Sequence, residues 1–198
     1  MISSFSDIRL RWRCEPSNWS VPAGRLVIAP DAPTDFWSKT HYGFEADNGH
    51  FLFTDITGDF LLSTDIFIMP RHQYDQAGLM VRLSKSCWLK ASIEFEPDKM
   101  NRLGAVVTNA GYSDWSTQDV PSSVNRFGLR VRREGGDYLV DGSLDSGGWT
   151  QLRVAHLHED VNPGAPVECG VYACSPKAVG FIAEFEKFMI ESPITVRS

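Results

Sequence analysis

The sequence predicts an all-β fold in which two antiparallel sheets pack face to face. Short runs rich in Val, Ile, Phe, Thr and Tyr recur along the chain, separated by Gly, Asn, Asp and Pro, a pattern typical of strands and turns. No stretch of 11 residues keeps a 3.6-residue apolar period, which disfavours helices. Many strands with alternating apolar residues indicate a sandwich or a closed barrel. The 198 residues contain 42% hydrophobic residues and no linker or repeat, so one domain over 1–198 is expected.

The runs and turns place about twelve strands along the chain. They lie within residues 24–30, 40–56, 58–70, 76–83, 86–96, 103–109, 126–157, 167–176 and 180–190. Pro30 and Pro70 end their strands, and Asn48-Gly49 is a turn signal between two apolar-aromatic runs. Gly135-Gly136 and residues 145–148 separate three strands, and residues 110–123 read as a loop.

Alternation divides the predicted hairpin of 76–83 and 86–96 into two faces. One phase is apolar and is predicted to lie between the sheets, as are Phe181, Ala183 and Phe185 of the last strand. The apolar phase of the hairpin comprises Ala77, Leu79, Val81, Leu83, Leu89, Ala91, Ile93 and Phe95. The other phase is predicted to face outward together and carries Gln76, Arg82, Trp88, Lys90 and Glu94.

Charge and cysteine usage exclude several classes. The net charge of −6 disfavours binding to nucleic acid or anionic membranes, which needs a basic surface. The start lacks a signal-like apolar region, and no apolar run reaches the roughly 20 residues of a membrane span. The four cysteines show no CxxC and no zinc spacing, so reduced, buried thiols in a cytoplasmic protein are expected. The alternative is a disulfide between any pair of them.

Several motifs carry a resemblance to known proteins. The segments DYLVDGSLDSGGWTQLRVAHL, ECGVYACSP and AEFEKFMI resemble the concanavalin A-like jelly-roll superfamily. The segments TDFWSKTHYGFEADNGHFLF, QYDQAGLMVRLSKSCWLKASIEFE and VVTNAGYSDWSTQ resemble one uncharacterised family within it, which includes a fungal member named for regulation of enolase. The resemblance covers residues 12–190. It implies a single intracellular jelly-roll domain and no established reaction.

The outward phase of the hairpin suggests a ligand-binding face. Sugar recognition uses an aromatic plane beneath the ring and a few forked polar groups for the hydroxyls. We therefore expect Trp88 to stack on a small carbohydrate, with Gln76, Arg82, Lys90 and Glu94 orienting it. Arg82 and Lys90 would also suit a phosphosugar. The alternative is a solvated face of cross-strand ion pairs covered by Trp88.

One turn region is expected to wall one side of this face, and two loops at the edge of the sandwich are further candidates for ligand binding. Trp37, His41 and Tyr42 cluster near a predicted turn, and a histidine beside aromatics suits ligand binding or proton transfer. Asp75 and Trp115 lie in polar-aromatic segments, 73–76 and 111–118. The alternatives are a half-buried histidine bonded to backbone, and aspartates such as Asp114 and Asp75 that cap their own turns.

A hydrolase is the second hypothesis, with Glu94 as the catalytic acid or base. Related glycosidases carry E-x-D-x-E on one strand, which points all acids to one face. Here the nearest run is Glu94-Phe95-Glu96-Pro97-Asp98, and the proline prevents Asp98 from aligning with Glu94. The partner carboxylate across the cleft would then be Asp75 or Glu45.

Other functions receive less support from the sequence. His41, His50 and Asp47 lack a fixed metal spacing, so no metal and no cofactor are predicted. No nucleophile elbow, P-loop or dinucleotide fingerprint is present. A third hypothesis is a regulatory module that binds a protein partner through the same outward face.

Overall fold

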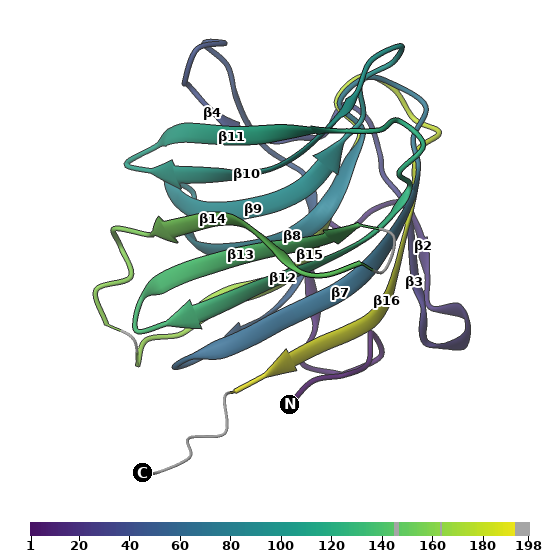
Figure 1. Cartoon of the computed structure of the whole chain (residues 1–198). Helices are drawn as coiled ribbons and strands as arrows, with labels where there is room; N and C mark the ends of the chain where they lie inside the picture. Colours follow the sequence, from purple (N-terminus) through teal and green to yellow (C-terminus); the bar gives the residue numbers. More distant parts are fainter. Residues whose placement is uncertain (145–146, 163, 193–198) are drawn as a thin grey trace.

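The structure is a computed structural model that describes residues 1–144, 147–162 and 164–192. It contains two seven-stranded antiparallel sheets packed as two layers (Figure 1). The first sheet runs in the order β1 (Arg11–Arg13), β6 (His50–Ile56), β15 (Val167–Cys174), β8 (Gln76–Ser84), β9 (Cys87–Glu94), β10 (Asn101–Asn109) and β11 (Tyr112–Val120). The second runs in the order β14 (Thr150–His156), β13 (Asp137–Leu144), β12 (Arg126–Glu134), β7 (Phe60–Met69), β16 (Ile182–Glu191), β3 (Leu26–Ala29) and β2 (Asn18–Ser20). The predicted jelly-roll sandwich is confirmed.

The core lies between the two sheets, as the alternation predicts. Ala77, Leu79, Val81 and Ile93 are all fully buried there. Leu89 and Ala91 join the same cluster, while Leu83 packs at its margin. Phe181, Ala183 and Phe185 are fully buried as well. Phe95 was predicted to be a core residue, but its side chain is only partly buried. The reason is that β9 ends at Glu94, the residue before Phe95.

Two predictions about the strands are wrong. Residues 110–123 were expected to be a loop, yet they contain β11, which pairs with β10 along nine positions. This strand lies at an edge of the sheet, most of its side chains are polar and few are buried, so its composition resembles that of a loop. The expected number of strands, about twelve, is also too low, because very short strands such as β1, β2, β4 and β5 gave no distinct signal.

A short hairpin lies outside the two large sheets. It consists of β4 (Phe36–Ser38) and β5 (Glu45–Asp47), which pair with each other, and we call residues 36–47 the flap. Asn48 and Gly49 follow the flap, and both backbone N–H groups donate to the Asp35 carbonyl. The predicted Asn48-Gly49 turn therefore leads from the flap into β6, and the strands beside it, β5 and β6, do not pair with each other.

The flap covers the face of the first sheet that points away from the core. Phe36 and Trp37 pack there with side chains of β6, β8, β9, β10 and β15, forming a second apolar cluster that we call the outer cluster. Its members are Phe36, Trp37, Phe51, Phe53, Met80, Trp88, Val106, Tyr172 and Cys174. Gly49 permits this packing, since a Cβ atom there would lie 2.3 Å from Phe36 Cε2.

The cysteines agree with the prediction at three positions. Cys87, Cys169 and Cys174 are free and buried, and burial raises the pKa of the Cys87 thiol to about 11. Cys14 is free but exposed, because it sits in a bend after β1 with a φ of 53°. In the described part of the chain, no helix has the length and apolar character needed to cross a membrane.

Candidate functional site

Strand register gathers polar side chains at one end of the outer face. Gln76 of β8 lies opposite Glu94 of β9. Lys90 of β9 lies opposite Val106 of β10, which in turn lies opposite Trp115 of β11. Directly opposite residues on one face of an antiparallel sheet have neighbouring side chains. Pairing therefore sets the Gln76 amide beside the Glu94 carboxyl group, and it places Lys90 and Trp115 on either side of Val106 on the same face.

Polar contacts fix the flap over this part of the sheet. Ser38 accounts for two of them: its N–H donates to Ser113 Oγ at 3.0 Å, and its hydroxyl donates to the Gly111 carbonyl at 2.7 Å. At the other strand of the flap, Arg82 makes a forked pair with Asp47, at 2.6 and 3.0 Å. The Arg82 side chain is only 4% exposed. Both strands of the flap are thus tied to the first sheet.

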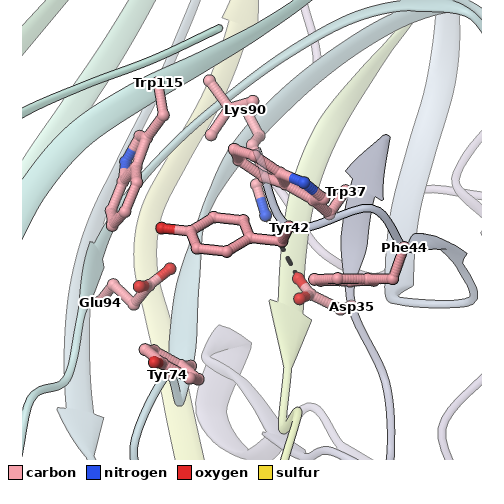
Figure 2. A pocket seen from close by; sticks show the side chains of 9 residues that line it. Asp35, Trp37, Tyr42, Phe44, Tyr74, Lys90, Glu94 and Trp115 are labelled. Atoms are coloured by element: carbon pink, nitrogen blue, oxygen red, sulfur yellow. Dashed lines mark hydrogen bonds and ion pairs between the residues drawn. The ribbon is translucent and has the colours of Figure 1, made fainter. Parts of the chain in front are cut away.

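A pocket opens between the flap and the sheet, and Figure 2 shows its lining. We call it the central pocket; its cavity volume is about 100 Å³. It is lined by Asp35, Trp37, Tyr42, Phe44, Tyr74, Lys90, Glu94, Val106 and Trp115. Aromatic side chains thus surround a floor that carries one ammonium and two carboxyl groups.

The floor is a hydrogen-bonded network centred on Gln76. Its Oε1 accepts from Lys90 Nζ at 2.8 Å and from the Tyr172 hydroxyl at 3.0 Å. Its Nε2 lies 3.2 Å from Glu94 Oε2 and 3.5 Å from Asp35 Oδ1. Lys90 Nζ also pairs with Asp35 Oδ1 at 3.4 Å (dashed line in Figure 2). These contacts satisfy the buried ammonium, which would otherwise be costly to bury.

The Glu94 carboxyl has a strongly shifted acidity. Burial at the end of β9 raises its pKa to about 8, the nearby Lys90 ammonium opposes this shift, and the negative charges of Asp35 and Glu96 add to it. A carboxyl group with this pKa is mainly protonated at neutral pH. Glu94 is therefore expected to offer a hydrogen-bond donor inside the pocket, next to Asp35 that is paired with Lys90.

The aromatic walls come from both the flap and the sheet. Trp37 contacts Tyr42 with ring centroids 5.3 Å apart, and it meets Trp115 edge to face at 6.4 Å. Figure 2 shows the hydroxyl end of Tyr42 directed toward the side of the pocket where Trp115 and Glu94 lie. Tyr74 faces the opposite end, below Glu94. Tyr42 is 56% exposed, so part of the wall remains open to solvent.

Of the residues predicted to bind a ligand, five line this pocket. They are Trp37, Tyr42, Lys90, Glu94 and Trp115. Gln76 lies directly beneath them in the floor network and is buried. His41 lies at the side, where its ring meets Tyr42 edge to face at 4.8 Å. The flap, β9 and β11 thus bring these five side chains to one face of the sheet.

The roles expected for Trp88 and Arg82 do not fit their surroundings. Trp88 was predicted to be an open stacking plane, but it is 2% exposed and belongs to the outer cluster beneath the flap. Its indole N–H donates to the Lys85 carbonyl at 3.2 Å. Arg82 was predicted to orient the ligand, but its guanidinium is occupied by Asp47. The sequence could not reveal this, since the flap that covers both is non-local.

The carboxylates expected across from Glu94 are also placed elsewhere. Asp75 is fully buried, and its oxygens accept from the backbone N–H groups of Arg71 and His72 and from the Ser175 hydroxyl. It therefore holds its own loop, as the alternative interpretation of this aspartate expects. Glu45 does not line the central pocket; it lies on the flap strand β5, 3.6 Å from Lys39 Nζ.

The histidines do not form a metal site. His50 is buried, with Nδ1 bonded to the Cys14 carbonyl and Nε2 accepting from the Asp31 N–H, so both ring nitrogens are used within the protein. Asp47 is paired with Arg82. Within residues 1–144, 147–162 and 164–192, no group of three or more His, Cys, Asp or Glu side chains is arranged to hold a metal ion.

Sequence reasoning missed three important residues of the pocket. Asp35, Phe44 and Tyr74 line it, but none was singled out as binding. Asp35 and Phe44 lie in TDFWSKTHYGFEAD, whose density of aromatic and acidic residues was the available signal. Tyr74 takes a φ of 74°, a conformation that sequence patterns do not reveal for a tyrosine.

The fold and this site define a β-sandwich protein with an aromatic-walled pocket on the outer face of one sheet. The chain belongs to the family described as "Protein of unknown function (DUF1349)", whose model matches residues 12–193. It is 34% identical to Regulation of enolase protein 1 of Saccharomyces cerevisiae over 187 residues, which cover 92% of this chain and 89% of the yeast protein. The resemblance expected from the sequence is therefore confirmed.

Solved structures show the same fold. A functionally unknown protein from Saccharomyces cerevisiae matches with a TM-score of 0.85 at 33% identity, covering 94% of this chain and 97% of that one. The GH43 protein BlXynB from Bacillus licheniformis matches with a TM-score of 0.70 at 14% identity, covering 93% of this chain but 37% of its own. The second likeness concerns the sandwich fold alone.

Proposed function

We propose that the central pocket binds a small neutral carbohydrate. The observation that carries this proposal is an aromatic wall, formed by Trp37, Tyr42 and Trp115, above a polar floor that contains Lys90 and Glu94. Aromatic rings accept the C–H face of a sugar, and a few fixed polar groups select its hydroxyls. The stacking role first expected of Trp88 passes to Tyr42, which is exposed, and to Trp115, which is half-buried.

The charge balance of the floor favours a neutral ligand over an anionic one. Lys90 is already paired with Asp35, and Arg82 is already paired with Asp47. Neither cation is available to neutralise a phosphate or a uronic acid without breaking its pair. A protonated Glu94, by contrast, can donate to a hydroxyl oxygen. A neutral polyol therefore suits the floor better than a phosphosugar does.

The test is a thermal-shift panel of neutral sugars, uronic acids, phosphosugars and divalent metals. A ligand that binds only the folded protein stabilises it by roughly 2.7 kcal/mol at a hundredfold excess over Kd. We expect a neutral sugar to raise Tm, and Trp115→Ala to abolish the shift. Trp149→Ala is the matched control, because Trp149 is exposed, packs over Arg130 and does not line the pocket.

The pattern of the panel distinguishes the proposal from its competitors. A shift with phosphosugars or uronic acids alone would contradict the argument from the paired cations. A sugar shift that survives Trp115→Ala would move the binding site away from the pocket. A panel without any shift would contradict carbohydrate binding, and a protein partner would become the better-supported function.

One observation favours hydrolysis as a second candidate. Asp35 and Glu94 both lie within hydrogen-bonding reach of a single atom, Gln76 Nε2, and both line the pocket. Glycosidases use two carboxyl groups about 5–9.5 Å apart, one protonated and one ionised. Glu94 would serve as the acid, and Asp35, paired with Lys90, as the base, in place of Asp75 or Glu45.

Hydrolysis is tested with the sugar chain that gives the largest thermal shift. Incubation with excess protein should release shorter sugars, and both Glu94→Gln and Asp35→Asn should stop the release while binding persists. Unchanged cleavage in both variants would remove these carboxyl groups from the reaction. Binding without any cleavage by the native protein would leave carbohydrate recognition as the function and exclude the hydrolase.

A further inference from the structure

The central pocket is small for a binding site. Its cavity volume is about 100 Å³, whereas pockets that enclose a ligand commonly measure about 300–1,000 Å³. It also has an incomplete wall, since Tyr42 is largely exposed. A ligand that enters this pocket must therefore have most of its surface outside it, and the neighbouring surface decides what the rest of the ligand contacts.

A wider depression adjoins the pocket on the side of β11. Its volume is about 650 Å³, and it shares Trp37, Tyr42 and Trp115 with the central pocket. Tyr112 and Asp114 extend it outward along the strand. Tyr112 is 60% exposed, so its ring is accessible beyond the shared aromatic wall, and Lys39 Nζ lies 5.4 Å from its centroid. We call this the Tyr112 depression.

A second depression adjoins the pocket at its other end. Its volume is about 470 Å³, and it shares Asp35, Phe44 and Tyr74 with the central pocket. Lys177 forms its outer end, with Nζ 5.2 Å from the centroid of the Tyr74 ring. We call this the Lys177 depression. Different residues are shared at each end, so the central pocket lies between the two depressions along the flap.

We propose that the natural ligand is an unbranched neutral oligosaccharide that places one unit in the central pocket and one in each flanking depression. This inference rests on the proposed function, since it assumes that the central pocket takes a sugar. It extends that function by naming a chain, as opposed to a free monosaccharide, as the ligand. Tyr112 and Lys177 then contact only the flanking units.

The surrounding charges indicate that this chain is neutral. Asp114 lies in the Tyr112 depression, and Glu45 and Asp47 lie in the Lys177 depression. Each of these carboxylates is paired with a cation: Asp114 with Arg153, Glu45 with Lys39 and Asp47 with Arg82. A surface whose charges are paired in this way offers a chain of uronic acids or a sulfated glycan little net attraction. The Lys177 ammonium lies against the Tyr74 ring at the outer end of its depression and does not line the central pocket.

The test is titration calorimetry with β-1,4-linked glucose, xylose, mannose and galactose series of one to four units. We expect affinity to rise about tenfold or more from one unit to three, and to change little from three to four. Tyr112→Ala and Lys177→Ala should each weaken trisaccharide binding about fivefold and leave monosaccharide binding unchanged. Trp149→Ala is the control that should alter neither.

The failure of this inference differs from the failure of the proposed function. A monosaccharide that binds as tightly as its trisaccharide would overturn the oligosaccharide and leave the carbohydrate pocket in place. The oligosaccharide would also be overturned if Tyr112→Ala and Lys177→Ala weaken binding of the one-unit and three-unit sugars equally, or leave both unchanged. No binding at any length, in any of the four series, would contradict the carbohydrate pocket itself and this inference with it.

Discussion

Replacing Glu94 by glutamine should change how the stability of the protein depends on pH. In the folded protein, burial raises the pKa of Glu94 from 4.5 to about 8. Between pH 4.5 and about pH 8, Glu94 therefore keeps its proton in the folded chain and loses it in the unfolded chain. Stability from the protonated carboxyl is therefore fully present below about pH 4.5 and is lost as pH rises toward 8. Glutamine keeps the neutral shape and has no proton to lose.

The magnitude follows from the size of the shift. Each pH unit well inside this window lowers the free energy of unfolding by about 1.4 kcal/mol, and the loss is smaller near either pKa. The native protein should therefore lose about 2.5 kcal/mol relative to Glu94→Gln between pH 5 and pH 7. The side chain is only half-buried, and solvent screening reduces the expected difference to about 2 kcal/mol. For a chain of this size that corresponds to about 4–8 °C in Tm.

The assay is urea unfolding of both proteins at pH 5 and pH 7. Comparing the two pH values within each protein and then between proteins cancels every other titrating group. Glu134→Gln is the matched control, because Glu134 is exposed and should follow the native protein. If the free energy of unfolding changes by the same amount from pH 5 to pH 7 in the native protein and in Glu94→Gln, the burial of a protonated carboxyl in this pocket is refuted.

Three further predictions concern the flap and the thiols. Asp47→Ala leaves the buried Arg82 without its forked partner and should lower the free energy of unfolding by about 3 kcal/mol. The control Asp55→Ala breaks an exposed ion pair and should lower it by less than about 1 kcal/mol. Equal effects of the two variants would contradict the anchoring of the flap. Gly49→Ala should destabilise the protein by about 1–3 kcal/mol in urea, because its Cβ would overlap the flap, and an unchanged midpoint would contradict that packing. A thiol reagent should modify Cys14 alone in the native protein and all four cysteines in denaturant, and fast reaction of a second thiol would show that the buried ones are accessible.

The sandwich followed from the sequence because its determinants are local. Alternation assigned Leu79 and Phe185 to the core, and the prolines and glycines marked where strands end. The same logic failed at β11, since an exposed edge strand with polar side chains has the composition of a loop. Pattern alone does not record which strands have a neighbour on only one side.

The site was predictable only in part, for a related reason. The alternation of side chains along a strand predicted that Lys90 and Glu94 lie on the face opposite the core, and both line the pocket. It could not show that the flap covers that face, which turns Trp88 into a buried residue and brings Asp35 beside Lys90. Those contacts join segments more than fifty residues apart, so they depend on tertiary structure alone.

A crystal structure of the protein with the neutral sugar that gives the largest thermal shift would test carbohydrate binding in the central pocket without any intermediate assumption. We expect a sugar ring in the central pocket, stacked against Trp115 or Tyr42, with its hydroxyls within hydrogen-bonding distance of Glu94 or Lys90. A sugar bound elsewhere on the molecule, with the central pocket holding only water, would show that the pocket is not the binding site.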